Sequence, residues 1–105
     1  MFGSKKEVTV YEACEVLGAD GHCLLDVRTH EEVAEVAVSG SLHIPLDRLE
    51  HEVHKLRDFD SLHVMCRSGG RSAMATSALQ GMGMKHAKNM KGGLLAWKAA
   101  NLPTQ

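Results

Sequence analysis

The sequence is poor in aromatic residues and contains no long apolar run. One Trp, one Tyr and two Phe occur in 105 residues, so we expect a core built from Leu, Val, Ala and the six Met residues. No stretch of about 18 apolar residues occurs, and the chain opens on Met-Phe-Gly-Ser-Lys-Lys rather than on an apolar signal core. These absences predict a cytoplasmic protein without an export or membrane-anchoring signal.

The sequence also lacks a strong net charge and paired cysteines. The formal net charge is −1 with neutral histidines, so neither nucleic acid nor an anionic membrane is expected as a partner. Cys14, Cys23 and Cys66 are widely spaced, without a Cys-x-x-Cys pair, and we interpret them as reduced thiols. His51 and His54 are flanked by charged residues and are assigned to a solvated helix face. We therefore expect no metal and no cofactor.

The length and composition are typical of one compact domain. A chain of 105 residues is long enough for one hydrophobic core and too short for two. Apolar residues make up 44% and charged residues 24% of the chain, which is ordinary for a globular protein. The prediction is a single domain over residues 1–105 that acts as a monomer with one active site.

Short β-rich runs alternate with helical patterns along the chain, which is typical of a parallel sheet covered by helices. The expected strands are Glu7-Val8, Cys23 to Asp26, Leu42 to Ile44, Leu62 to Met65 and His86 to Met90. We predict an α/β fold with a central, mainly parallel five-stranded sheet and helices on both faces. In such a fold the functional site lies at the carboxyl edge of the sheet.

Helix-start signals follow the first two strands. Thr9 with Glu12, and Thr29 with Glu32, form the capping-box pattern of a residue whose side chain bonds the helix start. They predict a first helix after Thr9 and a second helix over residues 30–37.

Three further helices are expected. Asp47 is predicted to cap a helix that extends to Leu56. A buried helix is expected from Ser72, where small and helix-forming residues begin. A last helix follows Gly92-Gly93, and Trp97 is expected to anchor it to the sheet.

A cysteine stands where the fourth expected strand meets a glycine-rich turn, in the segment Cys66-Arg67-Ser68-Gly69-Gly70-Arg71. A thiol between a strand end and a helix start lies over backbone N–H groups, whose field favours anions. The same field lowers the pKa of a thiol, so we expect Cys66 to be substantially thiolate near neutral pH. A thiolate is the reactive form, which makes Cys66 the candidate nucleophile.

The other residues of this segment suit an anionic substrate. Gly69 and Gly70 are expected to adopt positive φ and to turn their amides inward. Arg67 and Arg71 supply charge and donors for an oxyanion, and Ser68 completes the candidate binding loop. An inert buried cysteine is the alternative, but the surrounding residues favour a nucleophile that attacks sulfur in a thiosulfate-like anion or phosphorus in a phosphate ester.

Three segments, in order, resemble the rhodanese family, and the resemblance covers almost the whole chain. Asp26-Val27-Arg28 with Glu32, Gly40 and Ile44-Pro45 is similar to the family's second strand, helix and third strand. The segment from Cys66 to Arg71 resembles its active-site loop, Cys-Arg-Ser-Gly-x-Arg, and Gly92-Gly93 with Trp97 resembles its closing Gly-Gly-x-x-x-Trp pattern.

The resemblance implies a sulfurtransferase with a persulfide cycle. By analogy, Cys66 takes a sulfane sulfur from thiosulfate or a related donor and passes it to a thiol or cyanide acceptor, with a sulfur-relay protein as a further expected partner. Arg67 and Arg71 are expected to orient the anionic donor. Asp26 and Arg28 are assigned to structural support near the loop, with Arg28 paired to Glu32.

Two alternatives stay open. One is a phosphatase or arsenate reductase on the same scaffold. The related cell-cycle phosphatases carry one more residue between the cysteine and the arginine than separates Cys66 from Arg71. A shorter ring fits a sulfur atom better than a phosphoryl group. The other is a docking or sensory module without catalysis, against which the presence of Cys66 with both arginines argues.

Overall fold

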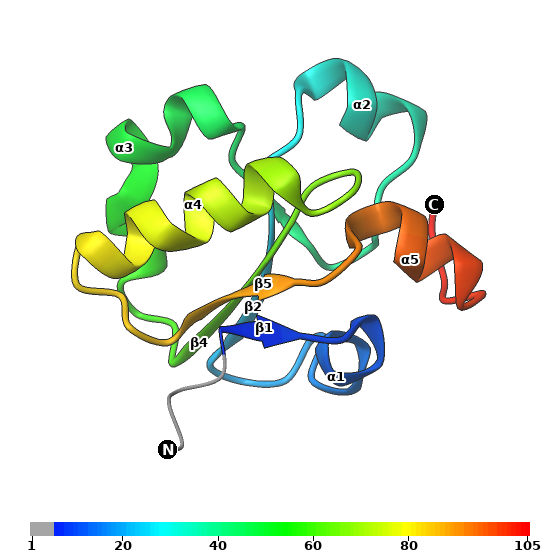
Figure 1. Ribbon diagram of the computed structural model, residues 1–105, viewed down its shortest axis with the longest axis horizontal. Coiled ribbons are helices and arrows are strands. Elements are labelled where there is room, and N and C mark those ends of the chain that lie inside the picture. The colour runs from blue at the N-terminus through cyan, green and yellow to red at the C-terminus, as the bar shows by residue number, and fades with distance from the viewer. Residues whose placement is uncertain (1–5) are drawn as a thin grey trace.

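The computed structural model describes residues 6–105. Their strands form one five-stranded sheet in the order β1-β5-β4-β2-β3 (Figure 1). The strands are β1 Glu7–Val8, β2 His22–Asp26, β3 Leu42–His43, β4 Ser61–Met65 and β5 Ala87–Met90. Every neighbouring pair runs parallel. This confirms the predicted sheet and aligns the carboxyl ends of its strands along one edge.

Helices cover both faces of the sheet, as predicted. They are α1 Val10–Glu15, α2 His30–Glu35, α3 Leu49–Glu52, α4 Gly70–Gly81 and α5 Gly93–Ala99. α3 and α4 pack on one face, and α1 and α5 pack on the other (Figure 1). Within residues 6–105, none of these helices has the length and apolar composition needed to cross a membrane.

The two central strands are buried on both faces, because a layer of apolar side chains lies on each side of them. Leu25 and Val64 are fully buried in the cluster under α3 and α4. Met65 and Trp97 are fully buried in the cluster under α1 and α5. Because Trp97 shares this cluster with Met65 of β4, the expectation that it anchors the last helix to the sheet is confirmed. Its Nε1 donates to the Pro103 carbonyl at 2.9 Å.

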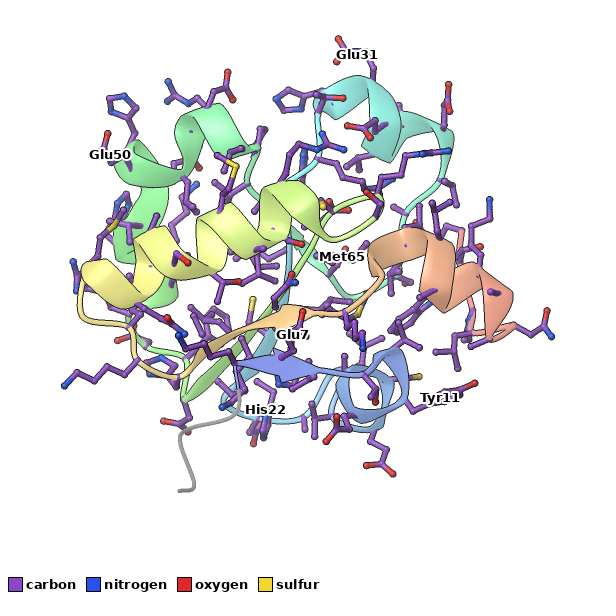
Figure 2. All side chains as sticks on the ribbon, viewed as in Figure 1. Glu7, Tyr11, His22, Glu31, Glu50 and Met65 are labelled. Atoms are coloured by element: carbon purple, nitrogen blue, oxygen red, sulfur yellow. The ribbon has the colours of Figure 1, made fainter. Side chains whose placement is uncertain are left out.

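Most charged side chains point outward, and most of the described methionines lie inside. Glu31 and Glu50 point outward, whereas Met65 lies inside (Figure 2). The expectation that methionines fill the core holds for Met84 and Met90, but Met74 is 67% exposed on α4. Met74 is exposed because the buried side of α4 is formed by its neighbours at helical spacing.

Both predicted capping boxes are present. The Glu12 amide donates to Thr9 Oγ1 at 3.1 Å while the Thr9 amide donates to the Glu12 carboxylate at 2.9 Å. Thr29 and Glu32 repeat this exchange at 3.2 and 3.1 Å. Both bonds satisfy amides that the first helical turn leaves unpaired.

Four predicted helix boundaries are wrong. α2 ends at Glu35, since Val36 is extended. Asp47 caps no helix, because the chain already turns after Pro45 into the 3₁₀ turn Leu46–Arg48, and α3 then begins without a side-chain cap. α3 ends at Glu52 rather than at Leu56, because the chain continues as a 3₁₀ turn over Val53–Leu56. α4 begins at Gly70 rather than at Ser72.

His63 predicts a pH dependence of stability on the α1 side of the sheet. Burial, the neighbouring His22 and Lys88 lower the pKa of His63 in that order, and Glu12 opposes them. The folded protein thus binds a proton at His63 less readily than the unfolded chain does. The contribution of neutral His63 to the free energy of unfolding is therefore complete above the ordinary pKa of histidine and is lost as the pH falls below it.

We expect His63→Gln to weaken the fall in unfolding free energy between about pH 8 and pH 5, measured by urea denaturation against the native protein. His51→Gln, on an exposed position, is the control and is expected to leave the pH dependence unchanged. An equal fall in the native protein and His63→Gln would contradict the assignment.

Candidate active site

Cys66 directly follows β4 at the carboxyl edge of the sheet, and β4 lies between β2 and β5. The chain then passes through a short loop and enters α4 at Gly70. The Cys66 residue is only 1% exposed. The sulfur is therefore enclosed by its own loop and the first turn of α4, at the edge where the sequence places it.

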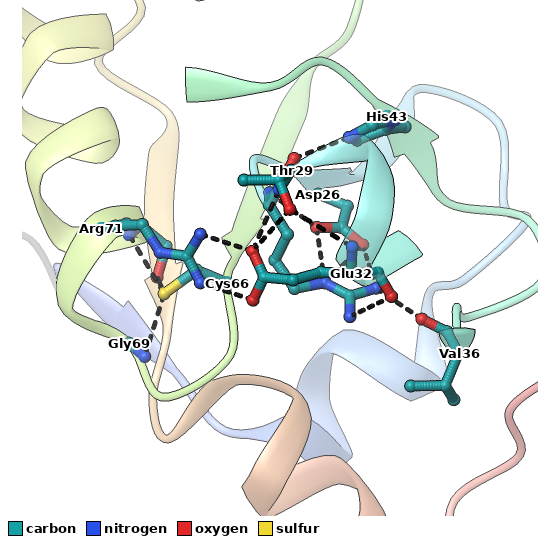
Figure 3. A network of polar contacts seen from close by, with 10 residues as sticks. Asp26, Thr29, Glu32, Val36, His43, Cys66, Gly69 and Arg71 are labelled. Atoms are coloured by element: carbon teal, nitrogen blue, oxygen red, sulfur yellow. Dashed lines mark hydrogen bonds and ion pairs between the residues drawn. The ribbon is translucent and has the colours of Figure 1, made fainter. Parts of the chain in front are cut away.

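Two amides and one hydroxyl lie within hydrogen-bond distance of the Cys66 sulfur. The Gly69 amide lies 3.1 Å from Sγ (Figure 3), the Ser72 amide 3.4 Å and the Ser72 hydroxyl 3.3 Å. These donors belong to the N-terminal end of α4 and its preceding residue, where unpaired amides and the helix dipole favour negative charge. The arrangement is a cradle for a sulfur anion.

The cradle outweighs the burial of the thiol. Burial raises the pKa of Cys66, but hydrogen bonds from the Ser72 hydroxyl and from the amides of Ser72, Gly69 and Ser68 bring the pKa below its ordinary value. Cys23 provides the contrast, because burial alone raises its pKa to about 11. The two cysteines show that donors, rather than position in the interior, favour a thiolate at Cys66.

One glycine of the loop has the predicted conformation and the other does not. Gly69 has φ of 109° and caps α4, so it supplies the left-handed residue that turns the chain from the loop into the helix. The prediction of positive φ at Gly70 is wrong, because Gly70 is already the first residue of α4.

The two arginines of the loop differ in their surroundings. The Arg71 guanidinium binds the Glu32 carboxylate through two hydrogen bonds of 2.7 and 2.8 Å (Figure 3). This pairing with Arg71 is the largest cause that lowers the pKa of Glu32, to about 2. Arg67 is exposed and forms no ion pair within residues 6–105. Arg67 is therefore the loop cation that is free to meet a ligand.

Asp26 and Arg28 form a buried ion pair at the end of β2. Arg28 Nη2 lies 2.7 Å from Asp26 Oδ2, and both residues are almost completely buried. The expected pairing of Arg28 with the Glu32 carboxylate is wrong, because Arg71 binds that carboxylate. Besides its pair with Asp26, Arg28 donates to the Val36 carbonyl at 2.8 Å. Arg28 thereby connects β2 to the C-terminal end of α2, the helix that carries Glu32.

The N-terminal end of α5 orients the active-site loop, a role that was missed from the sequence. The Leu94 amide donates to the Cys66 carbonyl at 2.9 Å and the Leu95 amide to the Arg67 carbonyl at 3.0 Å. A Cβ on Gly93 would lie 2.5 Å from that Cys66 oxygen. The loop carbonyls thus face α5, which leaves the loop amides on the side of the sulfur.

Sequence reasoning also missed Ser72 and Asn89 as site residues. Ser72 was assigned to the helix, yet its hydroxyl contacts Cys66 and also donates to Asn89 Oδ1 at 2.6 Å. Asn89 is 6% exposed in β5. A polar Asn within a short buried strand was the available signal, because a buried amide requires hydrogen-bond partners.

Two recesses flank the loop. One of about 470 Å³ has Arg71 at its edge and an apolar wall formed by Val27, Pro45 and Leu46. The other, of about 260 Å³, includes Arg67 and Lys98. Among residues 6–105 no group of three or more His, Cys, Asp or Glu side chains could hold a metal ion. Each recess is lined by one arginine of the loop, and neither is lined by Cys66 itself.

This combination of a parallel α/β sheet, a cysteine at its carboxyl edge and an amide-lined loop defines a class of cysteine-dependent transfer domains, and comparison with known proteins identifies the family. The sequence model that describes the rhodanese-like domain family matches residues 9–100 of this protein. The chain therefore belongs to the rhodanese-like domain family, as the sequence resemblance predicted.

Named relatives include sulfurtransferases. Thiosulfate sulfurtransferase 16, chloroplastic, of Arabidopsis thaliana is 36% identical over 110 residues, covering 93% of this chain and 91% of that protein. The putative sulfur carrier protein YrkF of Bacillus subtilis is 35% identical over 74 residues, 70% of this chain, and the match spans only 40% of its length. The human single-domain sulfurtransferase TSTD1 has a similar structure, with a TM-score of 0.80 at 25% identity over 91% of this chain and 97% of that one. These relatives support a sulfurtransferase family.

Gly93→Ala tests the contact between α5 and the loop. The added methyl group meets the backbone oxygens of Cys66 and Arg67, and Gly93 has φ of 59°. We expect the unfolding free energy to fall by at least about 1 kcal/mol, measured by urea denaturation. Gly81→Ala is the control, since a Cβ there meets no atom within 4 Å. An unchanged midpoint for Gly93→Ala would show that α5 does not constrain the loop.

Proposed function

We propose that this protein is a sulfurtransferase that carries a sulfane sulfur on Cys66 as a persulfide. The observation that supports the proposal is the ring of donors from Gly69 and Ser72 around the Cys66 sulfur. A persulfide places its negative charge on the outer sulfur. Inward-facing loop amides are suited to stabilise that charge in the same way as they favour the thiolate.

The proposed first half-reaction loads the cysteine. The Cys66 thiolate attacks the outer sulfur of thiosulfate, a new S–S bond forms to Cys66, and the S–S bond of thiosulfate breaks with its electron pair leaving as sulfite. Two negative charges enter on thiosulfate and two leave on sulfite. The product on the enzyme is the persulfide anion.

The proposed second half-reaction unloads it. A cyanide ion or a thiolate attacks the outer sulfur, the persulfide S–S bond breaks, and the electron pair returns to Cys66 as thiolate. The products are thiocyanate or a new persulfide on the acceptor. The relative YrkF is a putative sulfur carrier protein, which supports a protein thiol as a further acceptor.

We assign the contact with the sulfur-donor substrate, thiosulfate, to Arg67 rather than to both arginines. Arg71 is engaged by both oxygens of Glu32, so an anion would have to displace a carboxylate to reach it. Arg67 is exposed and shares its recess with Lys98. The sulfonate end of thiosulfate is therefore expected on the Arg67 side, while Arg71 ties α4 to α2.

Mass spectrometry of the protein after treatment with thiosulfate tests the persulfide. We expect a gain of one sulfur, about 32 Da, located on the peptide that contains Cys66. Cys66→Ser is expected to abolish the gain, and Cys14→Ser, on α1, to retain it. No gain with thiosulfate, 3-mercaptopyruvate or glutathione persulfide would refute sulfur transfer. Turnover of an aryl phosphate or of arsenate in that case would move the assignment to the alternative enzymes.

Steady-state kinetics distinguishes the two arginines. Arg67→Ala removes a charged donor worth about 1.5–3 kcal/mol, and we expect KM for thiosulfate to rise about tenfold or more. Arg57→Ala changes the net charge equally at an exposed position outside the active-site loop and is expected to leave KM unchanged. Arg71→Ala is expected to lower stability more than Arg67→Ala. An unchanged KM for Arg67→Ala would refute the donor assignment.

A further inference from the structure

The hydroxyl of Ser72 has two possible acceptors and one proton. Ser72 Oγ lies 2.6 Å from Asn89 Oδ1 and 3.3 Å from Cys66 Sγ. A hydroxyl donates one hydrogen bond and accepts others, whereas an amide oxygen only accepts. Ser72 therefore cannot donate to Asn89 and to the sulfur at the same time.

The orientation of the Asn89 amide is fixed by its other end. Asn89 Nδ2 donates to Glu7 Oε2 at 3.3 Å and to the Gly69 carbonyl at 3.4 Å. Glu7 is the register partner of Asn89 in the sheet and points from β1 toward β5 (Figure 2). A flipped amide would place its oxygen against these two acceptors. Asn89 Oδ1 is thus held toward Ser72.

The shorter of the two contacts decides where the proton lies when Cys66 is uncharged. With its proton on the Asn89 side, Ser72 presents lone pairs to Cys66, which suits a thiol that donates its own proton. The inner sulfur of a persulfide has no proton to donate, but because it is uncharged it loses less than a thiolate does when the Ser72 proton points to Asn89. A free thiolate requires the opposite arrangement, in which Ser72 turns its proton to Sγ and gives up the bond to Asn89.

We propose that Asn89, held in place by Glu7, is a positioning residue that competes with Cys66 for the Ser72 proton and thereby favours sulfur-loaded Cys66 over the free thiolate. The inference deepens the proposed function and rests on it for the loaded state. In the persulfide the charge lies on the outer sulfur, so Ser72 keeps its bond to Asn89 while the loop amides meet the charge. By keeping the Ser72 proton, Asn89 makes the free thiolate of Cys66 less stable.

The charged groups around this unit come from several elements. Arg71 on α4 interacts with Cys66 and is paired to Glu32 of α2. Asp26 at the end of β2 is paired to Arg28, and Glu7 of β1 contacts Asn89. The test must therefore leave Arg71, Asp26 and their partners in place.

The test measures the pH midpoint of Cys66 alkylation by iodoacetamide in protein without any sulfur donor, read on the Cys66 peptide by mass spectrometry. Asn89→Leu, similar in size and unable to accept, releases the Ser72 proton to the sulfur. We expect the midpoint to fall by about half a unit to one unit, the equivalent of one hydrogen bond. Ser72→Ala is expected to raise the midpoint instead.

A double variant separates competition for the proton from a structural effect. In the Ser72→Ala background, Asn89→Leu is expected to cause no further shift, because no hydroxyl remains to be released. Glu7→Gln replaces the charged acceptor of the Asn89 amide by a weaker neutral one, and we expect a smaller fall of the midpoint in the same direction, which the Ser72→Ala background removes. This variant carries the test if Asn89→Leu fails to fold.

The outcomes are decisive in both directions. A midpoint that stays or rises in Asn89→Leu or, where that variant does not fold, in Glu7→Gln would overturn the proposal, as would an equal shift of Asn89→Leu with and without the Ser72 hydroxyl. A lower fraction of persulfide at a fixed ratio of thiosulfate to sulfite is expected for Asn89→Leu. The alkylation experiment contains no donor, so its failure is distinct from a failure of sulfur transfer.

Discussion

The hydrogen bonds between main-chain amides and the Cys66 sulfur are the interaction on which the rest of the site depends. They require that the amide of Gly69 and that of Ser72 face inward, and this is possible only because the loop carbonyls are taken up elsewhere. Amides in the first turn of α5 donate to the carbonyls of Cys66 and Arg67. A buried thiol without such donors, such as Cys23, is driven toward the neutral form.

Charge pairing organises the edge of the sheet around this cradle. Arg28, paired with Asp26 at the end of β2, bonds the Val36 carbonyl at the end of α2, and the Glu32–Arg71 pair joins α2 to α4. Together these contacts connect β2 to α4, whose first turn includes the Ser72 groups that face the Cys66 sulfur. Because Arg71 is paired with Glu32, we propose Arg67 as the loop arginine that contacts an anionic ligand. A site of this kind fits both the membership of the protein in the rhodanese-like domain family and the proposed sulfur relay.

Local signals in the sequence predicted what depends on neighbours along the chain. The capping boxes at Thr9 and Thr29, the apolar runs that form the strands and the loop after Cys66 all depend on residues within a few positions. The missed features join distant segments: Arg71 with Glu32, Ser72 with Asn89, and α5 with the loop. Asp47 failed as a cap because Pro45 started a turn earlier, and Gly70 needed no positive φ because one left-handed residue at Gly69 suffices.

The most direct test of the cradle is amide-proton NMR of the native protein during a pH titration in the absence of any sulfur donor. If the amides of Gly69 and Ser72 donate to Sγ, their proton resonances shift together as Cys66 ionises, and Cys66→Ser abolishes the shift. Resonances that do not move while Cys66 loses its proton would mean that the amides do not hold the sulfur anion, and the account of the site would be wrong.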